Sequence, residues 1–383
     1  MPRLAESQTP NVAVIGTSHR VMLTRSLRYS FALLVSVFSL GCAADGVPTS
    51  PSVAPWYFPG SDASWERVRP AEAGFDSTLL AAALNWAGVQ SSSAVVVVWR
   101  GRIVMERYWN GWTTLTRGPY FSAGKTITAA ITLDLVHDGD VVLDAPASTY
   151  LGAGWSRNAL DESSISLRRL LSMSSGTNDS LQRIFAPTSA RFYYNNPAYY
   201  QLFGVIEAAT GQTMPAVTAA RLLTPIGMSR TLLLANEDTG EPGYIFAGSA
   251  RDFARFGILT LNHGRWNGAQ VLADSALLRQ ARQPSGTDNL SYGWMWWLNG
   301  GASHRTPGPY LLPTNAGPLF AAAPTDLAAA LGLDDKKLYV VPSLDLVVVR
   351  LGERAPISGA ANSLAITTFD NEFWTRLMAA RTP

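Results

Sequence analysis

The chain has 383 residues, of which 47% are hydrophobic and 15% are charged, and its formal net charge is +2. This length and composition indicate a globular protein with one large domain or two fused lobes. Four arginines and one glutamate precede Cys42 and carry a net +3, so the remainder carries +2 − 3 = −1. The basic charge therefore belongs to the amino-terminal segment, and nothing in the charge balance indicates a nucleic-acid-binding protein.

The amino-terminal segment has the pattern of an export signal. Residues 22–42 contain arginines, then an apolar core, then small residues. The core is too short for a comfortable membrane span, so we expect a secretory signal peptide over residues 1–42, with Met22 as the better start. Gly41-Cys42 resembles a bacterial lipoprotein signal with Cys42 lipidated, although Ser39 stands where that signal has leucine. The alternative is an ordinary cleaved signal with an incidental cysteine.

We therefore expect an exported bacterial protein, either periplasmic or held on a membrane by a lipid anchor at most. Residues 43–60 are rich in proline, glycine, serine and alanine and are expected to form a linker. The remaining residues, 61–383, are expected to form the functional domain. As the only cysteine, Cys42 cannot form an internal disulfide.

The domain begins with segments of clear periodicity. Residues 66–88 are expected to be helical. The β-branched run Ser93–Arg100 predicts a strand buried on both faces. Gly101 interrupts this run, and the alternation over Ile103–Trp109 predicts the second strand of a hairpin.

The stretch Phe121–Ile127 contains the first residues that carry chemistry. Helical spacing of the apolar residues that follow places Ser122 in the first turn of a helix, with Lys125 one turn further on the same face. A serine hydroxyl needs a base within hydrogen-bond reach to become a nucleophile. Lysine can be that base if burial lowers its pKa. Backbone N–H groups at the helix start favour the negative charge that develops during acyl transfer.

A Ser-x-x-Lys pattern alone also fits a serine-capped helix with a solvated lysine. The pattern seldom arises by chance in this chain, because Lys125, Lys336 and Lys337 are the only lysines in the sequence. The helix is expected to end near His137, with Gly139 as its cap. In that position His137 is expected to be structural and not catalytic.

The middle of the chain, about residues 140–235, is expected to be mostly helical. Pro197 suits the first turn of a helix that ends at Gly211, which puts Tyr194 and Asn196 on the loop before it. Further on, we expect a helix from Arg251 and an aromatic strand over 292–297. A strand pair over 338–341 and 346–351 and a final helix over 369–380 follow. Strands thus gather at both ends of the chain around a helical middle.

Ser-x-x-Lys followed roughly 70 residues later by Tyr-x-Asn resembles the serine β-lactamase and penicillin-binding-protein superfamily. The resemblance is to its class C-like branch, which holds esterases and 6-aminohexanoate-oligomer hydrolases, and it extends from about Trp65 to Leu377. It implies an α/β (α+β) fold, in which an antiparallel sheet flanked by helices carries an inserted all-helical lobe and the site lies in the cleft. The flanking stretches that share this resemblance are 170–176, 251–257, 264–268, 292–299 and 339–350.

The resemblance also implies roles for individual residues. Ser122 would be the nucleophile that forms an acyl-enzyme, with Lys125 and Tyr194 as the proton-transfer pair. Which of the two is the base stays open, because coupled groups titrate together. Asn196 would bind a substrate carbonyl or Lys125, although a simple loop asparagine is the alternative.

A second Tyr-x-Asn reading, Tyr193 with Asn195, overlaps the first. The spacing to Glu207 favours Tyr194 with Asn196.

The third motif of the superfamily departs from its usual form. Lys-Thr-Gly or a glycine pair is expected near residues 332–337, where Asp334 and Asp335 stand instead. The second oxyanion-hole N–H, assigned by the resemblance to Lys336, survives a change of side chain, but recognition of a β-lactam carboxylate is weakened. A solvated turn is the alternative for Lys336 and Lys337.

The sequence thus predicts an exported serine hydrolase that cleaves a small-molecule amide or ester through an acyl-Ser122 intermediate. The alternative is a catalytically inactive envelope protein of the same fold that binds a peptide or cell-wall fragment. No metal-ligand spacing or cofactor motif is present, so we expect no cofactor and no metal. The oligomeric state is left open.

Overall fold

The computed structural model describes residues 54–60, 64–157, 159–235, 243–272, 275–307, 313–356 and 368–382. The expected signal peptide, Cys42 and most of the expected linker lie outside these residues. No helix in the described ranges combines the length and the apolar composition needed to cross a membrane.

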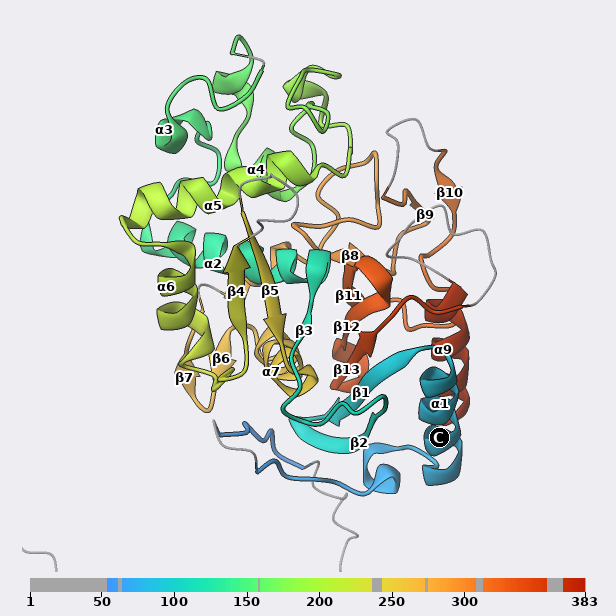
Figure 1. Cartoon of the computed structure of the whole chain (residues 1–383). Coiled ribbons are helices and arrows are strands. Elements are labelled where there is room, and N and C mark those ends of the chain that lie inside the picture. The colour runs from blue at the N-terminus through green and yellow to red at the C-terminus, as the bar shows by residue number, and fades with distance from the viewer. Residues whose placement is uncertain are drawn as a thin grey trace, which may run out of the picture. The chain divides into compact units, whose positions relative to one another are not determined.

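In the described chain, strands gather towards the two ends and an unbroken run of helices, η2 to η5, lies between β3 and β4 (Figure 1). The helices are η1 (Pro70–Ala73), α1 (Ser77–Val89), η2 (Phe121–Gly124), α2 (Lys125–Asp138), α3 (Ser148–Leu151), η3 (Glu162–Ser164), α4 (Leu167–Leu171), η4 (Pro187–Ser189), α5 (Asn196–Thr210), α6 (Met214–Thr218), η5 (Ala219–Leu223), α7 (Ala250–Leu261), α8 (Ser275–Gln280), η6 (Leu333–Asp335), η7 (Pro342–Leu344) and α9 (Thr368–Ala379). The strands are β1 (Ser92–Trp99), β2 (Arg102–Tyr108), β3 (Gly118–Pro119), β4 (Leu232–Ala235), β5 (Tyr244–Gly248), β6 (Arg265–Trp266), β7 (Ala269–Gln270), β8 (Trp297–Leu298), β9 (Ser303–His304), β10 (Asn315–Ala316), β11 (Ala328–Gly332), β12 (Lys336–Val341) and β13 (Leu346–Gly352).

The main sheet joins both ends of the domain. Its strand order is β2-β1-β13-β12-β11-β8, and its neighbouring strands are antiparallel. The valine-rich run of β1 is buried along nearly its whole length, as predicted, because β1 lies between two other strands in the interior of the sheet. The predicted pair of late strands is also confirmed, as β12 and β13.

Helices cover both faces of this sheet. Side chains alternate between faces along a strand, and on β13 Val347 contacts α7 whereas Arg350 lies against Phe369 of α9. The helix α7 comes close to the sheet at Gly257, where an added Cβ would lie 2.5 Å from Val347. On the other face, α1 and α9 pack together through the stacked rings of Trp86 and Phe369. The expected antiparallel sheet flanked by helices is therefore confirmed.

The helical middle lies between β3 and β4 in the chain and contains α2 to η5. The helices α2 and α5 pack against each other there, and Figure 1 shows them beside the smaller sheet β3-β5-β4. This smaller sheet was not predicted from the sequence.

Three local expectations were wrong. The first helix starts at Ser77 and not at residue 66, because Asp76 caps it by accepting from the N–H groups of Thr78 and Leu79. The aromatic stretch 292–297 is not one strand, because Met295 has a left-handed φ of 61° and only Trp297 and Leu298 pair as β8. Asn196 is the first residue of α5 and not part of the loop before it, because Asn195 is the cap.

Candidate active site

Ser122 lies in the short helix η2, which leads directly into α2. The residue before it, Phe121, has a positive φ of 48°. A bulky residue rarely adopts this conformation, and such strain gathers at functional sites. The Ser122 N–H lies in the first turn of the helix, where backbone N–H groups have no acceptor within the helix itself.

The η2 turn is held at two glycines that pack closely against neighbouring atoms. At Gly332, the end of β11, an added Cβ would lie 2.3 Å from the Tyr120 carbonyl oxygen and 3.1 Å from the Ala123 nitrogen. At Gly124, an added Cβ would lie 2.7 Å from the Phe246 ring of β5. The main sheet and the smaller sheet thus both press against the turn that carries Ser122.

Lys125 lies beside Ser122, as the spacing predicts. Its Nζ donates a hydrogen bond of 2.9 Å to Ser122 Oγ. The lysine side chain is buried, and burial lowers the pKa of Lys125 to about 7. A large fraction of this amine is therefore uncharged at neutral pH, in the form that can accept a proton.

Tyr194 comes to the same place from the loop before α5. Its hydroxyl lies close to the Ser122 side chain, and its ring centroid lies 5.3 Å from Lys125 Nζ. Its ring stacks on Trp297 at 5.9 Å and meets the edge of Tyr292 at 6.4 Å. Burial raises the pKa of Tyr194 well above its usual value, so the phenol keeps its proton at neutral pH.

The two asparagines after Tyr194 have different environments. Asn196 is exposed at the start of α5. Asn195 is buried, and its Nδ2 donates to the carbonyl oxygens of Thr177 and Asn178 while its Oδ1 accepts from the Ala198 N–H. Asn195 therefore fixes the loop that carries Tyr194. In the described part of the chain no hydrogen bond joins Asn196 to Lys125, and its expected contact with a substrate carbonyl stays a prediction.

The expectation for the backbone of Lys336 was wrong. Its N–H donates to the Leu333 carbonyl within the η6 turn, so it is not a free donor for an oxyanion. Its side chain is buried, with Nζ 5.1 Å from the centroid of the Phe121 ring and 3.7 Å from Asp334 Oδ2. Lys336 therefore lies next to the site through its side chain and not through its backbone N–H.

The aspartates that replace the expected glycines adopt the backbone conformation that glycine favours. Asp334 has a φ of 55° and Asp335 a φ of 58°. Aspartate tolerates this left-handed region better than most residues because its short polar side chain can hydrogen-bond locally. The departure from the motif therefore preserves a turn with left-handed residues at both positions.

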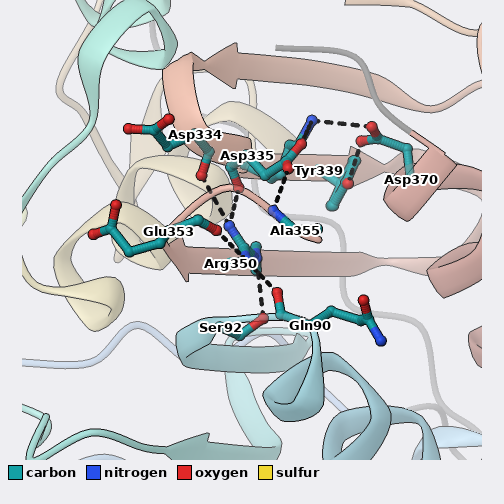
Figure 2. A network of polar contacts seen from close by, with 10 residues as sticks. Gln90, Ser92, Asp334, Asp335, Tyr339, Arg350, Glu353, Ala355 and Asp370 are labelled. Atoms are coloured by element: carbon teal, nitrogen blue, oxygen red, sulfur yellow. Dashed lines mark hydrogen bonds and ion pairs between the residues drawn. The ribbon is translucent and has the colours of Figure 1, made fainter. Parts of the chain in front are cut away.

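A buried network of charges holds that turn (Figure 2). Lys337 Nζ lies 3.1 Å from Asp335 Oδ1 and 3.0 Å from Asp370 Oδ2, and all three side chains are fully buried. Tyr339 donates a hydrogen bond of 2.6 Å to Asp370. Arg350 donates to the carbonyl oxygens of Asp334 and Asp335 at 3.0 and 2.9 Å.

The same guanidinium extends the network to the start of β1. Arg350 donates to Ser92 Oγ at 3.0 Å and to the Gln90 carbonyl at 2.8 Å. Both sequence ends of the domain are thus linked to the η6 turn beside Ser122. This network was not predicted from the sequence, in which only the neighbouring charges of residues 334–337 indicate it.

The structure also brings one unpredicted side chain to the site. Tyr199 of α5 places its ring centroid 4.5 Å from Lys125 Nζ. In the sequence it is one of several aromatic residues near the start of this helix, and helical spacing alone does not show which one faces Lys125.

Comparison with known proteins gives one family match. A sequence model for the family called Beta-lactamase matches residues 80–351, which is most of the chain. None of the curated proteins searched matches this chain.

Several solved structures share the fold. A provisionally assigned 6-aminohexanoate-dimer hydrolase from Bacillus anthracis has a TM-score of 0.58 at 21% identity, over 77% of this chain and 80% of that one. A penicillin-binding protein from Bacillus halodurans has a TM-score of 0.55 at 16% identity, over 79% and 98%. A D-stereospecific amidohydrolase from Streptomyces sp. has a TM-score of 0.55 at 15% identity, over 80% and 98%. Identities this low establish a common fold and do not identify a substrate.

Proposed function

Because this chain belongs to the beta-lactamase family, we propose that it is a serine hydrolase that cleaves an amide or ester bond through an acyl-Ser122 intermediate. The observation that carries the proposal is the 2.9 Å contact between Lys125 Nζ and Ser122 Oγ in a site where the lysine is buried. A buried amine without its charge is the base that a serine nucleophile requires.

The proposed reaction assigns a different proton-transfer role to each basic or phenolic group. Ser122 Oγ attacks the substrate carbonyl carbon while its proton passes to Lys125 Nζ. The tetrahedral intermediate then breaks the bond to the leaving group, which takes a proton from the Lys125 ammonium, directly or through the Tyr194 hydroxyl, so that Lys125 is neutral again. A water molecule then attacks the acyl-Ser122 ester while one of its protons passes to Lys125, and that proton returns to Ser122 Oγ as the acid is released. The lowered pKa of Lys125 and the raised pKa of Tyr194 favour the lysine as the base.

The pH dependence of activity tests this proposal on a p-nitrophenyl ester. Lys125 must be uncharged to accept the Ser122 proton, and its folded-state pKa is about 7. We therefore expect kcat/KM to be low below pH 7, to rise through about pH 7, and to level off above it. No loss from Tyr194 is expected near neutrality, because its raised pKa keeps the phenol protonated.

A profile that rises near pH 4 or 5 would instead indicate a carboxylate base and contradict the assignment of Lys125. Absence of hydrolysis of p-nitrophenyl esters and of linear amides over the whole pH range would reject the hydrolase itself. A chromogenic cephalosporin in the same assay tests whether a β-lactam is also cleaved. We expect weaker turnover of it, since Lys-Thr-Gly is missing from the third motif.

A binding protein without catalysis is the second candidate. The observation that favours it is the Lys336 N–H, which is engaged by the Leu333 carbonyl and so does not complete an oxyanion hole. The close contacts among Ser122, Lys125 and Tyr194 favour the enzyme, since binding alone requires no base beside a serine.

We also propose that the protein is exported, on the sequence of residues 22–42. A mass measurement of the mature amino terminus tests this. An unprocessed terminus would contradict it, and a lipid on Cys42 would distinguish the lipoprotein from an ordinary secreted form.

A further inference from the structure

The surroundings of Lys125 pose an electrostatic problem for the proposed reaction. When Lys125 accepts the Ser122 proton, it becomes a buried cation. In the described part of the chain it forms no ion pair with an aspartate or glutamate. The polar and titratable groups that face it are Ser122 of η2, Tyr194 of the loop before α5, and Tyr199 of α5. The positive charge on Lys125 must therefore be stabilised largely by uncharged polar and aromatic groups.

Tyr199 has the best geometry for this task. Its ring centroid lies 4.5 Å from Lys125 Nζ, closer than the 5.3 Å of the Tyr194 ring. The face of an aromatic ring attracts a cation through its quadrupole, and the attraction grows when the pair is removed from water. Tyr199 is 3% exposed, so this pair lies away from solvent.

The position of the Tyr199 ring is fixed from two sides. Its hydroxyl shares a 2.8 Å hydrogen bond with Thr128 Oγ1, on the same helix as Lys125 and one turn further on. Its ring also packs against Tyr200 and Phe203, with centroids 5.5 and 5.2 Å away. A ring held at its hydroxyl and along its edge cannot easily turn away from the amine.

We propose that Tyr199 is a positioning residue for the Ser122 reaction, whose ring face holds and stabilises the protonated form of Lys125 between the two proton transfers. This inference rests on the proposed function and adds a residue to it. Tyr199 does not touch the reacting atoms and acts through Lys125. The Thr128 hydroxyl helps to orient the ring, which the packing of Tyr200 and Phe203 also holds in place when the hydrogen bond is absent.

The test is a direct titration of Lys125 by NMR. The chain has three lysines, Lys125, Lys336 and Lys337, so protein labelled with ε-13C-lysine gives three signals, and the spectrum of Lys125→Met identifies the relevant one. Tyr199→Leu removes the ring face, whereas Tyr199→Phe keeps it and loses only the hydroxyl. Replacement of Tyr199 by pentafluorophenylalanine keeps the shape of the ring and removes its attraction for cations, which covers the case in which the leucine variant does not fold.

Loss of the ring face disfavours the charged amine, so the titration midpoint of Lys125 should fall. We expect a decrease of about 0.4 to 1.5 pH units in Tyr199→Leu and in the pentafluorophenylalanine protein. Tyr199→Phe should stay near the wild-type midpoint. The acid limb of kcat/KM should move to lower pH in parallel. An unchanged or raised midpoint in both ring-face variants would overturn the proposal.

This titration needs no turnover. If the wild-type protein hydrolyses nothing, the proposed function fails while the midpoints still report on Tyr199. If the protein is active but the midpoints do not move, only the role of Tyr199 fails.

Discussion

Ser122→Ala is expected to lower kcat/KM for a p-nitrophenyl ester by roughly 10³-fold or more, since no acyl-enzyme can form without the hydroxyl. The substitution removes one oxygen atom, which contacts Lys125 and Tyr194. The fold should survive, with a change in the free energy of unfolding of about 1 kcal/mol or less. Steady-state kinetics and thermal unfolding on the same preparation measure both quantities.

The matched control is Ser343→Ala. Ser343 lies in η7, at the other end of β12 from the η6 turn, and its hydroxyl bonds Asp326 at the surface. We expect this variant to keep wild-type kinetics. A Ser122→Ala protein that is folded and retains the wild-type rate would show that another residue is the nucleophile.

Lys337→Met is expected to lower the free energy of unfolding by about 3–5 kcal/mol, because it leaves two buried carboxylates without their shared cation. Both carboxylates, of Asp335 and Asp370, are fully buried and lie within 3.1 Å of Lys337 Nζ. Methionine fills much of the same space as lysine, so the decrease in the free energy of unfolding comes from the missing charge and not from a cavity. Chemical denaturation followed by tryptophan fluorescence measures it.

Glu372→Gln is the matched control on the same helix, α9. Glu372 pairs with Arg376 at 2.7 Å, but both side chains are well exposed to solvent. Removal of this exposed charge should cost about 0.5 kcal/mol or less. A Lys337→Met protein that loses no more stability than Glu372→Gln would show that the network does not hold the η6 turn.

The sequence predicted those parts of the fold that depend on local pattern. The valines of β1, the paired strands β12 and β13, and the spacing of Ser122 and Lys125 all follow from the periodicity of a strand or a helix. The convergence of Tyr194 on Ser122 came from the resemblance and not from spacing. Two side chains more than 70 residues apart meet only through the packing of α5 on α2.

The parts that were missed depend on tertiary contacts. The strand β11 is rich in alanine, which favours helix, and it is a strand because its residues are buried between β12 and β8. Asn196 begins α5 and is not part of the loop before it, because Asn195 takes the cap position, and the sequence alone does not show which of two neighbouring asparagines is the cap. The Lys336 N–H is not free because Asp334 and Asp335 form a turn in which this N–H donates a hydrogen bond to the Leu333 carbonyl oxygen.

Intact-protein mass spectrometry after treatment with a serine-reactive fluorophosphonate, followed by peptide mapping, measures directly whether Ser122 is an activated nucleophile. The account predicts one covalent adduct on the Ser122 peptide, with labelling that increases as pH rises through about 7 because Lys125 loses its charge there. A folded protein with no adduct at any pH, or with its adduct on a different serine, would contradict it and favour the binding protein or another site.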